Sequence, residues 1–299
     1  MAELTAKRPV SVPVMADLAA RGESPEILFW VGCAGAFDDR YKRVTRAFVR
    51  ILDHVGVNYA VLGMEESCTG DPAKRAGNEF LFQMQAMTNI ATLNGYGIKK
   101  VVTACPHCFN TIKNEYPALG GEYEVMHHSS FLQQLINEGK VKAEGGESFK
   151  GRRITFHDSC YLGRANNIYE APRAVLEVLD ADLVEMKRCK TNGLCCGAGG
   201  AQMWKDAEPG NKEVNIERTE EALATLDGNA AVLDNLRGVQ SNAPADPAPA
   251  KAAGGSVIAV ACPFCMTMMA DGVKNKEREQ DVQVFDLAEL IASAEGLNA

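Results

Sequence analysis

The cysteines of this 299-residue chain fall into two sets with the same spacing. In each set, 34 residues separate the first two cysteines, and a Cys-x-x-Cys pair follows. The first set is Cys33, Cys68, Cys105 and Cys108, and the second is Cys160, Cys195, Cys262 and Cys265. The first two cysteines of one set are offset by 127 residues from those of the other. This spacing predicts a duplicated folding unit rather than one large domain.

Composition along the chain gives the expected limits of the two units. The closing pairs are offset by 157 residues, so the second unit has extra residues before its last pair. A Pro-, Ala- and Gly-rich stretch at about 241–255 is predicted to be a surface loop that accounts for half of them. The polar, glycine-rich stretch 139–153 marks a boundary. We therefore expect an N-terminal extension at 1–25, a first cysteine-rich domain at 26–140 and a second at 152–299.

Short apolar runs alternate with segments of helical periodicity in both units. Strands are predicted at 27–32, 57–63 and 98–104, and helices at 40–54 and 73–93. The second unit repeats this alternation from residue 152 onward. Strand–helix alternation with short loops predicts parallel sheets with right-handed crossovers. The predicted fold class is therefore α/β, with two tandem parallel-sheet units related by approximate twofold symmetry.

The cysteines are placed where such sheets bind ligands. Four of them follow a predicted strand directly, namely Cys33, Cys105, Cys160 and Cys262. The carboxyl ends of parallel strands form the functional crevice of open α/β sheets, so the thiolates of each unit are expected to converge there. In a reducing cytosol, clustered cysteines are better explained as metal ligands or catalysts than as disulfides. Four thiolates suit either Zn²⁺ or an iron–sulfur cluster.

The adjacent pair Cys195-Cys196 favours the iron–sulfur alternative. Neighbouring side chains diverge, so both thiolates fit poorly around one tetrahedral ion, whereas a polynuclear cluster offers several metal positions. Zinc sites also usually bring two close cysteine pairs, and each unit here has one. Zinc, and redox thiols without metal, remain the alternatives.

Several function classes are disfavoured. The 31 basic and 39 acidic residues give a net charge of −8, which argues against nucleic-acid binding. A run of 18 apolar residues and a secretory leader are both absent from the sequence, so we expect a chain that does not itself span a membrane. The expected location is cytoplasmic, or peripheral on the cytoplasmic face of a membrane. The glycines at 197–200 do not continue into a dinucleotide fingerprint, because Gln202 stands where glycine is needed.

The second unit resembles the cysteine-rich CCG domain family, to which the catalytic subunit of heterodisulfide reductase belongs. The resemblance rests on Cys160, then Cys195-Cys196-Gly197 after 34 residues, then Cys262-x-x-Cys265 after a further 65. The phrase that begins at His157 and ends at Arg164 also resembles the family's lead-in to this motif. The similarity extends over about residues 26–292. It implies a [4Fe–4S] cluster at each complete motif, non-cubane in form, where a disulfide is reduced.

The two units do not match the family pattern equally. The second has all five cysteines, Cys160, Cys195, Cys196, Cys262 and Cys265. In the first, Thr69 stands where the family has its second adjacent cysteine, which leaves four thiols, the number for an ordinary cubane. The resemblance thus implies two [4Fe–4S] clusters, the second one non-cubane. It implies catalytic roles for Cys195 and Cys196, with His157 nearby.

The resemblance implies an iron–sulfur electron-transfer or catalytic subunit of a heterodisulfide-reductase-like oxidoreductase. A ferredoxin-type cysteine run is absent from the sequence, so we expect another chain to supply electrons. The expected partners are a ferredoxin-type subunit, a membrane quinone-linked subunit or an electron-transfer flavoprotein. The alternatives are an electron carrier without substrate chemistry and a zinc-stabilised interaction protein.

Four further residue positions have two interpretations each. His157 is expected to donate a proton near the second cluster or to make a structural hydrogen bond. His107 lies between two predicted ligands and either tunes a redox potential or packs. His127-His128 follows a strand and is expected to cap or pack. Cys189 has no counterpart in the first unit, and is either a structural thiol or an auxiliary ligand.

Overall fold

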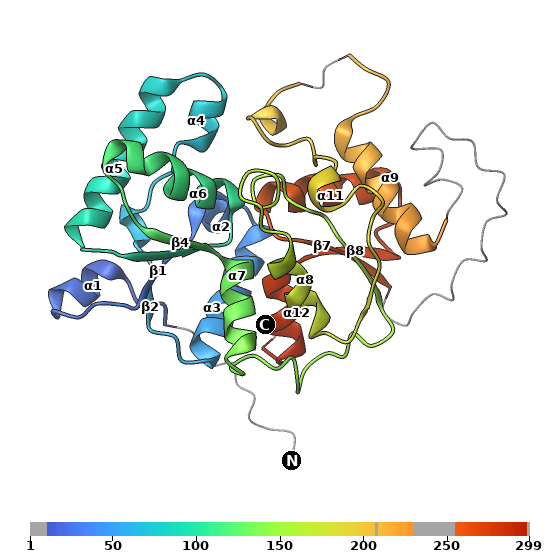
Figure 1. Ribbon diagram of the computed structural model, residues 1–299, viewed down its shortest axis with the longest axis horizontal. Helices are drawn as coiled ribbons and strands as arrows, with labels where there is room; N and C mark the ends of the chain where they lie inside the picture. The colour runs from blue at the N-terminus through green and yellow to red at the C-terminus, as the bar shows by residue number, and fades with distance from the viewer. Residues whose placement is uncertain (1–10, 207–208, 230–254, 298–299) are drawn as a thin grey trace.

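The computed structural model describes residues 11–206, 209–229 and 255–297. The predicted loop insertion at 241–255 lies outside these ranges except for its last residue. The described residues contain two four-stranded sheets, and every strand pair in both is parallel. The strand orders are β2-β1-β3-β4 and β6-β5-β7-β8, so the two sheets share one topology. This confirms the predicted α/β class with a repeated unit (Figure 1).

The first half of the chain builds one sheet with its covering helices. In chain order its elements are α1 Met15–Ala20, β1 Ile27–Trp30, α2 Gly32–Phe37, α3 Tyr41–His54, β2 Tyr59–Ala60, α4 Asp71–Arg75, α5 Glu79–Gly95, β3 Lys100–Thr103, α6 Pro106–Asn110, β4 Glu124–His127 and α7 His128–Asn137. Val14 bridges to Val61 in parallel, so residues just before α1 join the edge of this sheet.

The second half repeats the plan. Its elements are β5 Arg153–Phe156, α8 Glu170–Glu177, β6 Asp182–Leu183, η4 Lys190–Asn192, η5 Gln202–Trp204, α9 Val214–Asp227, β7 Ser256–Val260, α11 Pro263–Asn275, β8 Val282–Asp286 and α12 Leu287–Ala294.

The single helix predicted at 73–93 is two helices in the structure, α4 and α5. Gly77 between them has a φ of +87°, which a helix cannot continue through. The side chain of Asn78 then caps α5 by accepting a hydrogen bond from the Leu81 amide at 3.0 Å. The break frees α4 to carry Asp71 beside the cysteines.

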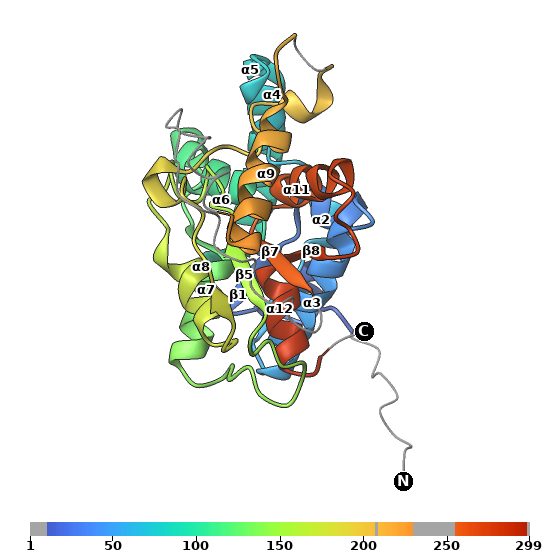
Figure 2. The same cartoon turned by 90° about the vertical axis from the view of Figure 1, so that its right-hand side faces the viewer.

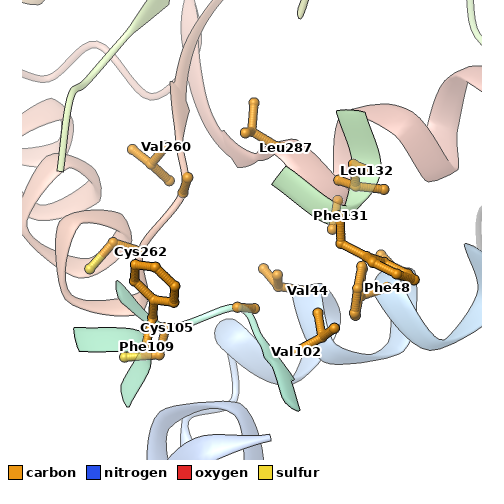
Figure 3. Packing of buried hydrophobic residues seen from close by; sticks show 14 of the residues in the cluster. Val44, Phe48, Val102, Cys105, Phe109, Phe131, Leu132, Val260, Cys262 and Leu287 are labelled. Atoms are coloured by element: carbon orange, nitrogen blue, oxygen red, sulfur yellow. The ribbon is translucent and has the colours of Figure 1, made fainter. Parts of the chain in front are cut away.

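The last helix of each half packs on the first long helix of the other. The helix α12 packs against α3, and α7 packs against α8 (Figure 1). Apolar side chains from both halves form one continuous core, in which Val44 and Phe48 of α3 lie near Phe131 and Leu132 of α7 and Leu287 of α12 (Figure 3). The two sheets are therefore held together by a dry interface as well as by the connecting chain.

Candidate metal centres

The first site lies at the carboxyl ends of β1 and β3, where the strand order reverses. Cys33 is carried by α2 directly after β1, and Cys105 and Cys108 begin α6 directly after β3. The loop after β2 brings in Cys68. All four line one cavity together with Thr69. The structure thus brings together the four cysteines predicted for this unit.

Backbone and hydroxyl donors point at these sulfurs. The Gly70 amide donates to the Cys68 sulfur at 3.5 Å, and the Thr69 hydroxyl lies 3.8 Å from the Cys108 sulfur. Hydrogen bonding from Cys33, and then from the Gly70 amide, lowers the pKa of the Cys68 thiol to about 6. Gly70 has a φ of +89°, and a Cβ there would lie 2.8 Å from the Phe82 ring. Glycine is therefore required for this close approach.

The second site has the same construction from β5 and β7. Cys160 follows β5, Cys262 is the N-cap of α11 and Cys265 lies in its first turn, while Cys195 and Cys196 come from the loop before η5. The Cys196 and Cys265 sulfurs are 3.4 Å apart. Hydrogen bonds also link the thiol of Cys195 to those of Cys160 and Cys196. All five cysteines predicted for this unit therefore form one connected group.

The amide of Gly197 donates to the Cys195 sulfur at 3.3 Å, as that of Gly70 does to Cys68. The hydrogen bonds from Cys160 and Cys196 are the main cause of a pKa for Cys195 far below its ordinary value. Cys196, Cys262 and Cys265 are buried, while Cys160 and Cys195 are half-buried. A thiolate is thus stabilised at the rim of a site whose other sulfurs are shielded from water.

His157 lies fully buried beside this group. Its Nδ1 accepts a hydrogen bond from Nε of Arg218 at 3.0 Å, and Arg218 itself pairs with Glu221 at 2.9 Å. The other ring nitrogen, Nε2, is buried and has no hydrogen-bond partner among the described residues. A ligand atom of His157 and the sulfurs of Cys196 and Cys265 lie within 4.8 Å of one another. Burial, and then the positive charge of Arg218, lowers the pKa of His157 to about 3, so the imidazole is neutral.

The first half has an N–H donor at the equivalent place. Trp30 precedes Cys33 by three residues, as His157 precedes Cys160. Its indole Nε1 is also buried without a hydrogen-bond partner in the described part of the chain. Both halves thus bury an unpaired ring nitrogen at the end of the strand that leads into the site.

The two sites face each other across the interface between the halves. His107 of the first site hydrogen-bonds Asp71 at 2.8 Å and also the thiol of Cys262 in the second. Its ring centroid lies 4.3 Å from that of Tyr161 and 4.7 Å from that of Phe264. Burial alone would lower the pKa of His107, but Asp71 and Cys262 outweigh it and raise the pKa to about 10. Figure 3 shows Cys105 and Cys262 on neighbouring segments of the two halves.

Other predicted residues lie apart from the sulfurs. The electrostatic neighbours of Cys189, a half-buried thiol, are Glu185 and Arg173 rather than another cysteine. His127 caps α7 by accepting from the Ser129 amide at 3.3 Å. His128 hydrogen-bonds Asp286 across the interface at 2.9 Å, so this histidine pair caps and packs as expected.

Two supporting residues were not predicted. Arg218 lies in α9, and its distance from His157 in the sequence leaves no local pattern to reveal it. Glu66 accepts hydrogen bonds from the amides of Val31, at 3.0 Å, and Gly32, and so holds the start of α2 that carries Cys33. Burial raises the pKa of Glu66 to about 7, although the two amides act against this shift.

Searching the described residues for membrane-spanning segments finds no helix of sufficient length and apolarity. A model of the CCG cysteine-rich domain matches residues 27–113 and 154–233. The first match contains all four cysteines of its half, and the second contains Cys160, Cys195 and Cys196. The two matches therefore coincide with the repeated unit of the fold.

Three curated relatives resemble nearly the whole chain. The probable iron-sulfur-binding oxidoreductase FadF of Bacillus subtilis is 40% identical over 95% of this chain and 36% of its own length. The EtfAB:quinone oxidoreductase of Syntrophomonas wolfei is 41% identical over 91% and 35%. One of the subunits of the dihydromethanophenazine:CoB–CoM heterodisulfide reductase of Methanosarcina barkeri is 32% identical over 92% and 60%. The chain thus spans little more than a third of the first two relatives.

Proposed function

Starting from a chain that belongs to the CCG cysteine-rich domain family, we propose that it is the iron–sulfur electron-transfer and catalytic part of a heterodisulfide-reductase-like oxidoreductase. The observation that carries this proposal is the connected group of five cysteines in the second half. The 3.4 Å contact between Cys196 and Cys265 puts a fifth thiol where four already converge. Tetrahedral zinc takes four ligands, so the donor set fits a polynuclear iron–sulfur centre better.

The proposed ligands are the cysteines of the two sites. Cys33, Cys68, Cys105 and Cys108 would hold one [4Fe–4S] cluster, and Cys160, Cys195, Cys196, Cys262 and Cys265 would hold a second, non-cubane one. A bound cluster of this kind supplies one-electron redox chemistry. The amides of Gly70 and Gly197 each donate to a ligand sulfur and so stabilise its negative charge.

His157, Cys195 and Cys196 are the proposed catalytic residues. An arginine nitrogen is always a donor, so the hydrogen bond from Arg218 requires Nδ1 of His157 to be the acceptor. The single ring proton is therefore held at Nε2, the atom without a partner in the described chain. We infer that His157 presents this N–H to the sulfurs of Cys196 and Cys265. The half-buried Cys195 lies on the side from which a disulfide substrate would approach.

The first site suits a relay between the surface and the second site. Cys33 is exposed, whereas Cys262 is buried next to His107. Electrons that enter at the first site have a short buried route to the second through contacts between the two halves. We infer that the four-thiol site passes electrons inward and that the five-thiol site uses them.

An exposed apolar stripe supports docking of an electron-supplying partner. Phe80, Met84 and Met87 lie at i, i+4 and i+7 on α5 and are 52–76% exposed. The same helix contacts the first site, because Asn89 donates to the Cys68 carbonyl at 3.0 Å. Exposed apolar stripes of this kind mark interaction sites. The proposed partners are a ferredoxin-type subunit, a membrane quinone-linked subunit or an electron-transfer flavoprotein, and the proposed location is the cytoplasm or the cytoplasmic face of a membrane.

The test uses protein purified anaerobically with its metal. We expect dithionite to reduce it and NADH alone to leave it oxidised, since a partner must supply the electrons. Disulfide reduction with an artificial low-potential donor should be lost in Cys196→Ser and kept in Cys189→Ser, the matched control. Full-rate disulfide turnover with NADH alone would contradict the subunit proposal. Reducible protein that never turns over a disulfide would assign a pure electron carrier instead.

A further inference from the structure

A second cavity lies between α3 of the first half and α12 of the second (Figure 2 shows the two helices side by side). Its volume is about 470 Å³, and none of its lining residues is a cysteine. Arg43, Arg46 and Arg50 line one side. Phe149 and Leu290, both almost fully buried, belong to its apolar wall.

The three arginines form a stripe of like charge. They lie three and four residues apart, so they share one face of α3, where like charges repel one another. Arg43 and Arg46 are exposed, and in the described ranges their side chains make no hydrogen bond or ion pair. Arg50 reaches the Leu297 carbonyl at 3.4 Å, a long contact. The stripe therefore carries positive charge that the protein itself does not balance.

The carboxylates in the cavity are already engaged. Glu289 accepts two hydrogen bonds from Arg40, at 2.6 and 2.8 Å. Glu147 accepts from Arg152 at 2.6 Å and from the Ser293 hydroxyl at 2.7 Å. Neither acid is available to the stripe.

We propose that this cavity binds a small phosphorylated molecule that also carries an apolar group, of about the size of a mononucleotide. Guanidinium groups match phosphate oxygens in a fork geometry, and three of them exceed the charge of one carboxylate. The volume lies in the range of small-molecule pockets, which combine an apolar wall with a few charged groups. The ligand would bridge the two halves. The inference does not depend on the metal centres.

Calorimetric titration of the metal-loaded protein with ADP tests the site at low salt. We expect saturable binding that weakens as salt is added. Arg43→Gln combined with Arg46→Gln should weaken binding by at least about tenfold, the loss of one charge-assisted contact or more. Arg21→Gln, an exposed arginine outside the cavity, should bind ADP unchanged. Adenosine and inorganic phosphate, which each supply half of the proposed ligand, should both bind more weakly than ADP.

Three results would overturn the proposal. ADP would give no binding at millimolar concentration, or would bind the double variant as tightly as the native protein. Alternatively, vesicles of phosphatidylglycerol would bind through the same arginines while ADP does not, which would assign a membrane surface instead. Circular dichroism of each variant separates loss of binding from loss of folding. Since the readout is heat rather than electron transfer, failure of the redox proposal would leave these outcomes readable.

Discussion

Thr69 and Cys196 hold equivalent positions in the two halves of the chain. Each directly follows the second cysteine of its set, and each contacts the last cysteine of the closing pair. The Thr69 hydroxyl lies 3.8 Å from the Cys108 sulfur, and the Cys196 sulfur lies 3.4 Å from that of Cys265. One half thus offers a hydroxyl where the other offers a thiol, so the two sites hold different donor sets on the same scaffold.

This difference predicts separate responses to mutation. In Cys196→Ser the second site loses its fifth thiol, so the paramagnetic signal of the second cluster should disappear while that of the first remains. Thr69→Ser keeps a hydroxyl in the first site and should leave both signals in place. Electron paramagnetic resonance of dithionite-reduced protein checks both variants. If Cys196→Ser lost both signals while still folded, or lost neither, Cys196 would not be a specific ligand.

Asp286 joins the halves through buried partners. It accepts from the Tyr41 hydroxyl at 3.2 Å, contacts His128 at 2.9 Å and caps α12. Asp286→Ala leaves these buried groups unpaired, so the free energy of unfolding should fall by about 3–5 kcal/mol. Urea unfolding followed by tryptophan fluorescence measures this change. Lys42→Ala, which breaks an exposed pair with Asp39, should change the value by less than about 0.5 kcal/mol.

The sequence specifies much of this architecture because spacing and strand patterns are local. The shared 127-residue offset and the apolar runs before Cys33 and Cys160 were sufficient to predict two parallel sheets with cysteines at their ends. The break at Gly77 was missed because the helical periodicity continues on both sides of it. Its φ of +87° becomes known only from the structure.

Contacts between distant segments were not predictable in this way. Arg218 fixes the ring of His157, yet nothing near either residue indicates the other. The same holds for His107, which was placed between two ligands of its own half but also bonds Cys262 of the other. Such pairs depend on how the halves pack, and the packing follows from the whole core rather than from any one motif.

Gly70 allows a close approach that a side chain would block. In Gly70→Ala the new Cβ would lie 2.8 Å from the Phe82 ring and the residue would keep an unfavourable φ of +89°. The loop should move and the Cys68 sulfur lose its amide donor, so iron at the first site should fall. Gly97→Ala is the control, because its φ is +66° but nothing lies within 4 Å of the Cβ. Equal iron content in the two variants would contradict the role given to Gly70.

The N–H of His157 should raise the redox potential of the second centre, because hydrogen bonds to ligand sulfur stabilise the more negative, reduced state. In His157→Phe the potential of that centre should become more negative, and His157→Gln, which keeps an N–H donor, should shift it less. Trp30→Phe, the equivalent change in the other half, should leave the second potential unchanged. Redox titration followed by paramagnetic resonance gives the values. Identical second-centre potentials in native protein and His157→Phe would remove His157 from the site.

Metal analysis of anaerobically purified protein tests the central claim most directly. Iron, acid-labile sulfide and zinc are measured together with protein concentration. We predict a brown protein with about eight irons and matching sulfide, the content of two four-iron clusters held by the nine cysteines. Stoichiometric zinc without sulfide, in a colourless protein, would contradict the iron–sulfur assignment.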